Sequence, residues 1–131
     1  MRRAIAGRTQ PDQPDDMVET VDQLRLERLD ILKINRVDHA PRIVAGASDT
    51  IWRLRPLLFV SGPHGAGVEA ISAMARDFGY HTFRRDVPWF NPQNFNRRSE
   101  DVFGSRSETV VLGVPEEREG FASPPGYRDI S

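Results

Sequence analysis

Four polar residues lie at the end of an apolar run near residue 30, and their types suit acid–base chemistry. The run covers residues 29–34, and the polar residues are Lys33, Asn35, Asp38 and His39. Asp38 or His39 could accept a proton from an oxygen nucleophile, and Asn35 could form a hydrogen bond with a substrate. We take these four as candidate catalytic residues. An ordinary polar loop after a strand is the competing interpretation.

A second cluster combines aromatic rings with amides within the long segment 86–108. It contains Trp89, Phe90, Asn91, Asn94 and Phe95. Aromatic faces can pack on the C–H groups of a polyol or sugar, and amides can bind its hydroxyls, so Trp89, Asn91 and Asn94 are candidate substrate-binding residues. Alternatively, the aromatics anchor an irregular loop and the asparagines cap its turns.

Nearby arginines leave the charge of such a substrate open. They could favour a phosphorylated or nucleotide-linked molecule, or they could form a solvated face. The residues concerned are Arg84, Arg85, Arg97, Arg98 and Arg106.

Other patterns indicate less chemistry. The glycine-containing segment 61–67 lacks the Lys-Ser/Thr pair of a P-loop, so a plain strand-to-helix turn is favoured, with His64 at the surface. There is no cysteine, and His39, His64 and His81 lie far apart in the sequence, so we predict no metal site.

Composition places limits on the class of protein. The chain has 131 residues and a formal net charge of −1, which gives no broad electrostatic footprint for nucleic acid. No apolar run is long enough for a signal sequence or a membrane span, so we expect a cytoplasmic protein that binds neither membrane nor nucleic acid.

Strands and helices alternate in the segment that must position these residues. The apolar patterns predict strands at 29–34, 56–60, 80–83 and 109–114, with helices at 40–54 and 68–78. This order predicts an α/β fold with a largely parallel sheet and an antiparallel last strand. Residues 18–115 form the predicted domain, and residues 1–17 and 116–131 are predicted to be flexible tails.

The same order resembles the carboxy-terminal half of the class I, Rossmann-like methyltransferase fold, from strand four to strand seven. Residues 18–24 (VETVDQL) resemble the TLDDL segment that precedes strand four in FkbM-type methyltransferases. Residues 29–34 (LDILKI) match the strand that follows, and Gly46 and Ala47 have the spacing of the family's L-x-G-A segment.

Two further segments carry the resemblance into the second half of the chain. Residues 55–60 (RPLLFV) are similar to the family's RPLLxVE strand. Residues 88–95 (PWFNPQNF) and 102–104 (VFG) are similar to the P-x-F-N-P-x-N-F and V-F-G loop of one subgroup. The resemblance implies ancestral O-methylation with S-adenosylmethionine, with a saccharide hydroxyl as a candidate acceptor.

The acidic residues of the family are absent. Where the family has D-V-E-G-A-E after strand four, this chain has residues 35–40, NRVDHA, and Ser61 replaces the acid that ends strand five. The strands that hold the cofactor in the family have no counterpart before residue 18. We therefore expect that the isolated chain does not bind S-adenosylmethionine. Three interpretations stay open: a half that needs a partner with the cofactor site, a degenerate remnant, and a non-catalytic binding or interaction module.

Two structural expectations follow. In the complete fold the strand at 29–34 pairs with strand one, so here we expect an open apolar edge covered by a homodimer contact or a partner chain. We also expect the segment 86–108 to be ordered and folded back over the carboxyl ends of the strands, near Asn35 and Ser61. Trp89 is expected to be buried there as an anchor rather than exposed to a ligand.

Overall fold

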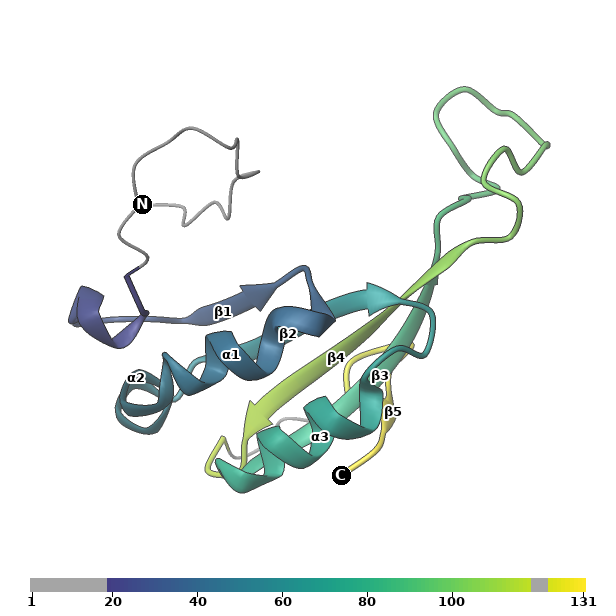
Figure 1. Ribbon diagram of the computed structural model, residues 1–131. Helices are drawn as coiled ribbons and strands as arrows, with labels where there is room; N and C mark the ends of the chain where they lie inside the picture. The colour runs from purple at the N-terminus through teal and green to yellow at the C-terminus, as the bar shows by residue number, and fades with distance from the viewer. Residues whose placement is uncertain (1–18, 119–122) are drawn as a thin grey trace, which may run out of the picture.

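The computed structural model describes residues 19–118 and 123–131, in which strands alternate with helices as far as β3 and two further strands follow (Figure 1). The first half contains η1 (Asp22–Leu24), β1 (Ile31–Ile34), η2 (Val37–His39), α1 (Ala40–Ala45), α2 (Ser48–Leu54) and β2 (Leu57–Pro63). The second half contains α3 (Val68–Asp77), β3 (Tyr80–Pro88), β4 (Ser107–Pro115) and β5 (Arg128–Asp129). The predicted α/β class is confirmed.

The five strands form one mixed sheet in the order β1-β2-β4-β3-β5. β1 and β2 are parallel, whereas β4 is antiparallel to both β2 and β3, and β5 is antiparallel to β3. The predicted largely parallel sheet is therefore wrong. The cause is the position of β4: by inserting between β2 and β3 it replaces one parallel contact with two antiparallel ones.

All three α-helices lie on one face of the sheet (Figure 1). Their apolar side chains pack against Ile34, Leu58, Val60 and Val111, which together form the main core. Side chains alternate between the two faces of a strand. Leu57, Phe59 and Leu112 therefore point to the opposite face, where they remain half-buried.

The single helix predicted for residues 40–54 is two helices, with a break at Gly46 and Ala47. The backbone N–H of Asp22 donates to the carbonyl oxygen of Gly46, at 2.9 Å. The Asp22 carboxylate accepts hydrogen bonds from the backbone N–H groups of Asp49 and Thr50, at 3.2 and 2.8 Å. Asp22 thus caps α2 from outside the helix, as an acid at a helix N-terminus does.

Arg55 joins the end of α2 to the end of α3. Its guanidinium donates hydrogen bonds to the carbonyl oxygens of Phe78 and Gly79, at 2.6 and 2.9 Å, and it pairs with Glu117. It also lies 4.7 Å from the centre of the Tyr80 ring. The arginine of the RPLLFV segment therefore satisfies the carbonyls that a helix C-terminus leaves free.

Three strands are longer than predicted, and this changes the long loop. β2 continues past Val60 to Pro63, β3 continues past Phe83 to Pro88, and β4 begins at Ser107. Residues 89–106 consequently form the tip of a β3–β4 hairpin, which we call the arm. The arm projects away from the sheet (Figure 1), so the expectation that it folds back over the strand ends is wrong.

The end of the chain also differs from expectation. Within the predicted tail 116–131, β5 pairs with β3, and Ile130 packs against the core. The predicted N-terminal tail, residues 1–17, lies outside the described residues. No helix in the described ranges is long and apolar enough to cross a membrane.

Candidate functional site

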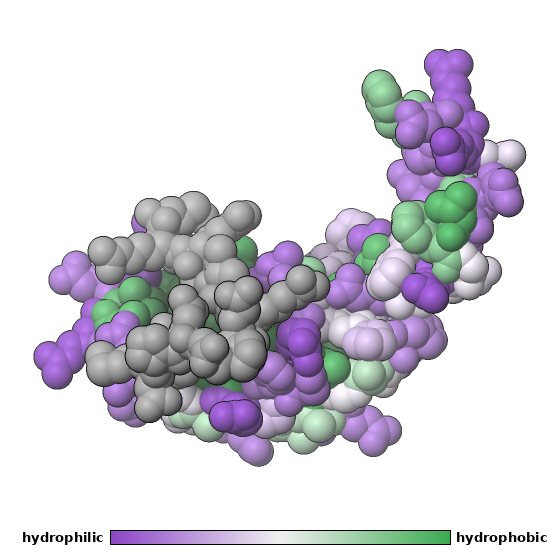
Figure 2. Space-filling model, turned by 45° about the horizontal axis from the view of Figure 1, so that its top comes forward, coloured by the Kyte–Doolittle hydropathy of each residue, from purple (hydrophilic) through white to green (hydrophobic). Residues whose placement is uncertain are grey.

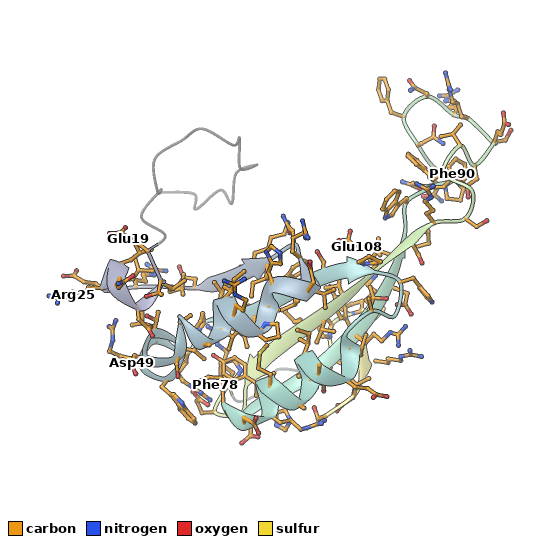
Figure 3. The ribbon with its side chains drawn as sticks, in the orientation of Figure 1. Glu19, Arg25, Asp49, Phe78, Phe90 and Glu108 are labelled. Atoms are coloured by element: carbon orange, nitrogen blue, oxygen red, sulfur yellow. The ribbon has the colours of Figure 1, made fainter. Side chains whose placement is uncertain are left out.

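An open cleft lies where the carboxyl ends of β1 and β2 meet the base of the arm. It has a volume of about 700 Å³. Figure 3 labels Glu108, which lies where the arm leaves the sheet. The lining residues are Asn35, Gly62, Pro63, His64, Trp89, Ser105, Arg106, Ser107 and Glu108. Ligands of open α/β sheets bind at this end of the strands.

The four candidate catalytic residues are not brought together. Only Asn35 lines the cleft. The Lys33 ammonium lies 5.5 Å from the centre of the Phe59 ring, on the sheet face opposite the helices. His39 is half-exposed beside Asp38, with 3.5 Å between its Nε2 and the carboxylate.

Asp38 is poorly suited to the role of a base. Its carboxylate accepts two hydrogen bonds from the Arg36 guanidinium, at 3.1 and 2.7 Å. These hydrogen bonds lower the pKa of Asp38 to about 2. A carboxylate with such a pKa has little affinity for a proton at neutral pH.

Trp89 belongs to the cleft and is not buried. Its side chain is 49% exposed. The Arg106 guanidinium lies 5.9 Å from its ring centre, and the Phe103 ring meets it edge-on, with 6.0 Å between centroids. The expectation of a buried anchor is therefore wrong. These two neighbours hold the indole while leaving half of its surface accessible.

The two candidate asparagines of the arm hold turns. Asn91 accepts a hydrogen bond from the backbone N–H of Gln93, at 2.9 Å. Asn94 donates to the carbonyl oxygens of Asn91 and Arg98 and accepts from the Arg98 N–H, so its amide is occupied within the arm. Neither asparagine lines the cleft.

A polar cluster that the sequence analysis did not identify borders the cleft. Ser107 Oγ lies 2.9 Å from His64 Nδ1, and Asp86 Oδ1 lies 3.8 Å from the same nitrogen. The Thr109 hydroxyl donates to Asp86 and accepts from the Gly65 N–H. The hydrogen bond from Thr109 and then the pairing with Arg84 lower the pKa of Asp86, although burial raises it.

This cluster is not a hydrolytic triad. In such a triad the serine and the acid bind different nitrogens of the imidazole, so that a proton passes through the ring. Here Ser107 and Asp86 approach the same Nδ1 of His64. The arrangement instead fixes the turn at residues 64–67 against β4. The sequence carries no signal for it, because the contact depends on the register that pairs Asp86 with Thr109.

Apolar residues occupy two positions where the resembled family has acids. A Cβ atom added to Gly62 or Gly67 would lie 2.6 or 2.4 Å from a methyl group of Val37, so the Val37 side chain fills the space beside both glycines. Ala40 is fully buried in the core. Val37 and Ala40 thus contribute packing.

Comparisons with family models, with curated proteins and with solved structures found no match for this chain. No group of three or more histidines, cysteines or acids within residues 19–118 and 123–131 could hold a metal ion.

Proposed function

We propose that this chain is an FkbM-type methyltransferase-like half-domain that binds an acceptor molecule in the cleft. We expect that the isolated chain does not bind S-adenosylmethionine, because apolar residues occupy two of the positions where the resembled family has acids. The proposal rests on the sequence resemblance together with the cleft, because the resemblance supplies the reaction class and the cleft supplies a place for the acceptor.

The order of elements supports the fold part of the proposal. Three strands joined by helices are followed by an antiparallel strand without an intervening helix, which is the order that the resemblance implies. Two segments of the resemblance also have structural roles: Asp22 of the VETVDQL segment caps α2, and Arg55 of the RPLLFV segment binds the end of α3.

The observation that carries the functional part is the contrast at the strand ends. Asn35, His64 and Trp89 line an open cleft, whereas Val37 and Ala40, at the family's acid positions, are packed. A site of this kind offers an amide, an imidazole and an indole to a ligand. It lacks the carboxylates that the family places beside them.

Titration calorimetry with S-adenosylmethionine tests the proposal. We expect no binding heat with millimolar cofactor added to the 131-residue chain. Micromolar affinity with one site per chain would overturn the proposal.

A pair of variants tests the acid positions separately. Ala40→Glu places a charge at a fully buried site and should destabilise the fold by about 3 kcal/mol or more. Asn35→Asp is the matched control, because Asn35 is exposed, and its melting temperature should not change. If Ala40→Glu folded normally and bound the cofactor, the family's site would be intact and the proposal wrong.

A non-catalytic interaction module is the second candidate, and the arm favours it. Phe95 is 99% exposed and Val102 is 62% exposed, although Asn94 and Asp101 order the turns around them. Figure 2 shows hydrophobic residues on the surface of the projecting arm. If the arm binds another chain, Phe95→Ser should reduce association measured by light scattering and leave ligand binding in the cleft unchanged.

A further inference from the structure

We infer that the cleft binds a neutral saccharide ring rather than a phosphorylated or nucleotide-linked one. This inference rests on the proposed function, since it names the class of acceptor for the same cleft. Its basis is the distribution of charge around Trp89.

Most of the arginines that could favour a phosphate are directed elsewhere. Arg84 pairs with Asp86, with a shortest distance of 3.0 Å. The Arg85 guanidinium lies 5.8 Å from the centre of the Tyr127 ring, and Arg97 and Arg98 belong to the arm and do not line the cleft. Of the five, only Arg106 lines it.

The charge of Arg106 is balanced within the cleft. Glu108 is also a lining residue, and neither Arg106 nor Glu108 forms an ion pair within the described part of the chain. One cation and one anion give the lining no net charge when His64 is neutral. A phosphate would therefore gain attraction from Arg106 but suffer repulsion from Glu108.

The same groups suit the hydroxyls of a sugar. The half-exposed indole of Trp89 offers a flat apolar surface for the C–H groups of a pyranose ring. Around it, Arg106 can donate hydrogen bonds, Glu108 can accept them, and the Asn35 amide can do both. A few polar groups of this kind in a mainly apolar pocket fix the orientation of a ligand.

Fluorescence of Trp89 provides the test. The chain has two tryptophans, so Trp52→Phe leaves Trp89 as the reporter. We would titrate this variant with glucose, galactose and mannose, and with the matching sugar phosphates. At least one neutral sugar should give a saturable change, and its phosphate should bind about tenfold more weakly or worse, a difference of about 1.4 kcal/mol.

Variants in the same background assign the effect to the cleft. Glu108→Gln removes a carboxylate that accepts hydrogen bonds from hydroxyls and repels phosphate. It should therefore weaken binding of the neutral sugar and strengthen binding of the sugar phosphate. Phe95→Ala is the matched control, because this residue is on the same arm outside the cleft, and it should change neither affinity.

Two results would overturn the inference: tighter binding of a sugar phosphate than of its neutral sugar, or no saturable response to any neutral sugar. Either result would leave the calorimetry with S-adenosylmethionine unaffected. Conversely, cofactor binding would refute the proposed function without changing the outcome of the sugar titrations.

Discussion

The sheet and the arm use aromatic side chains in opposite ways. Tyr80 at the start of β3 is 1% exposed, and its hydroxyl donates to the carbonyl oxygen of Pro56, at 2.8 Å. Trp89, just beyond the end of the same strand, is 49% exposed. One strand thus leads from the core to a surface with exposed apolar groups. The aromatics near its start stabilise the fold, and those beyond its end are exposed to solvent.

Truncation of Tyr80 should have the largest effect on stability. Tyr80→Ala removes a buried ring and should cost about 3–5 kcal/mol of the free energy of unfolding, as for other large core aromatics. Chemical denaturation followed by circular dichroism would measure it. Tyr80→Phe keeps the ring but leaves the Pro56 carbonyl without its partner, so it should cost about 1 kcal/mol. An equal loss in both variants would contradict the assigned role of the ring.

Removal of the external cap should have a smaller effect within the sheet region. Asp22→Ala leaves two N–H groups at the start of α2 without their acceptor and should cost about 1 kcal/mol. A melting curve measures the change. The same substitution at Thr20 serves as a comparison, because the Thr20 side chain accepts only a long hydrogen bond, 3.3 Å from the Gln23 N–H.

The contribution of Asp22 should depend on pH. Burial raises its pKa, but the hydrogen bonds from Thr50 and Asp49 lower it more, so the folded value lies below the ordinary 3.8. The stabilisation is therefore present above pH 3.8 and is lost as the pH falls through the folded value. The difference in stability between wild type and Asp22→Asn should shrink below this pH. A constant difference would contradict the charged cap.

The sequence predicted the parts of this molecule that depend on local patterns. The apolar run at 29–34 and the spacing of Val68, Ile71 and Ala75 identify β1 and α3, because each pattern reports which side of one element is buried. The position of β4 between β2 and β3 was not predictable in this way. It depends on pairing between strands that are distant in the sequence, as does the contact of Asp86 with Thr109.

The candidate site could be predicted only in part, again because pairing between distant strands decides which residues meet there. Asn35 was identified by its position at a strand end and Trp89 by its place in the aromatic and amide cluster of the long segment, and the structure brings both to one cleft. Lys33 was misplaced because strand residues alternate in direction, so it lies on the opposite sheet face from its neighbours in the core. His64, Arg106 and Glu108 join the cleft through the β2–β4 and β3–β4 pairings.

The unpaired edge of β1 gives a prediction about association of the sheet region with another chain. Among the described residues β1 pairs only with β2, and Ile31 is 55% exposed. An unpaired apolar edge favours association, so we expect a dimer or a partner complex. Ile31→Lys should shift light scattering towards the monomer without lowering the melting temperature by more than a few degrees. A monodisperse wild-type monomer over a wide concentration range would contradict this prediction.

Replacement of Trp89 should have the smallest effect on stability, and it separates the arm most clearly from the sheet. The indole contacts Arg106 and Phe103, both exposed residues of the same arm, so its removal leaves no cavity in the core. We expect Trp89→Ala to change the free energy of unfolding by about 0.5 kcal/mol or less, as for surface substitutions. Saccharide binding in the cleft should nevertheless be lost, measured by calorimetry because the reporter is gone. A loss of several kcal/mol would show that Trp89 anchors the arm to the fold, and the cleft would then owe its shape to a structural residue rather than to a binding one.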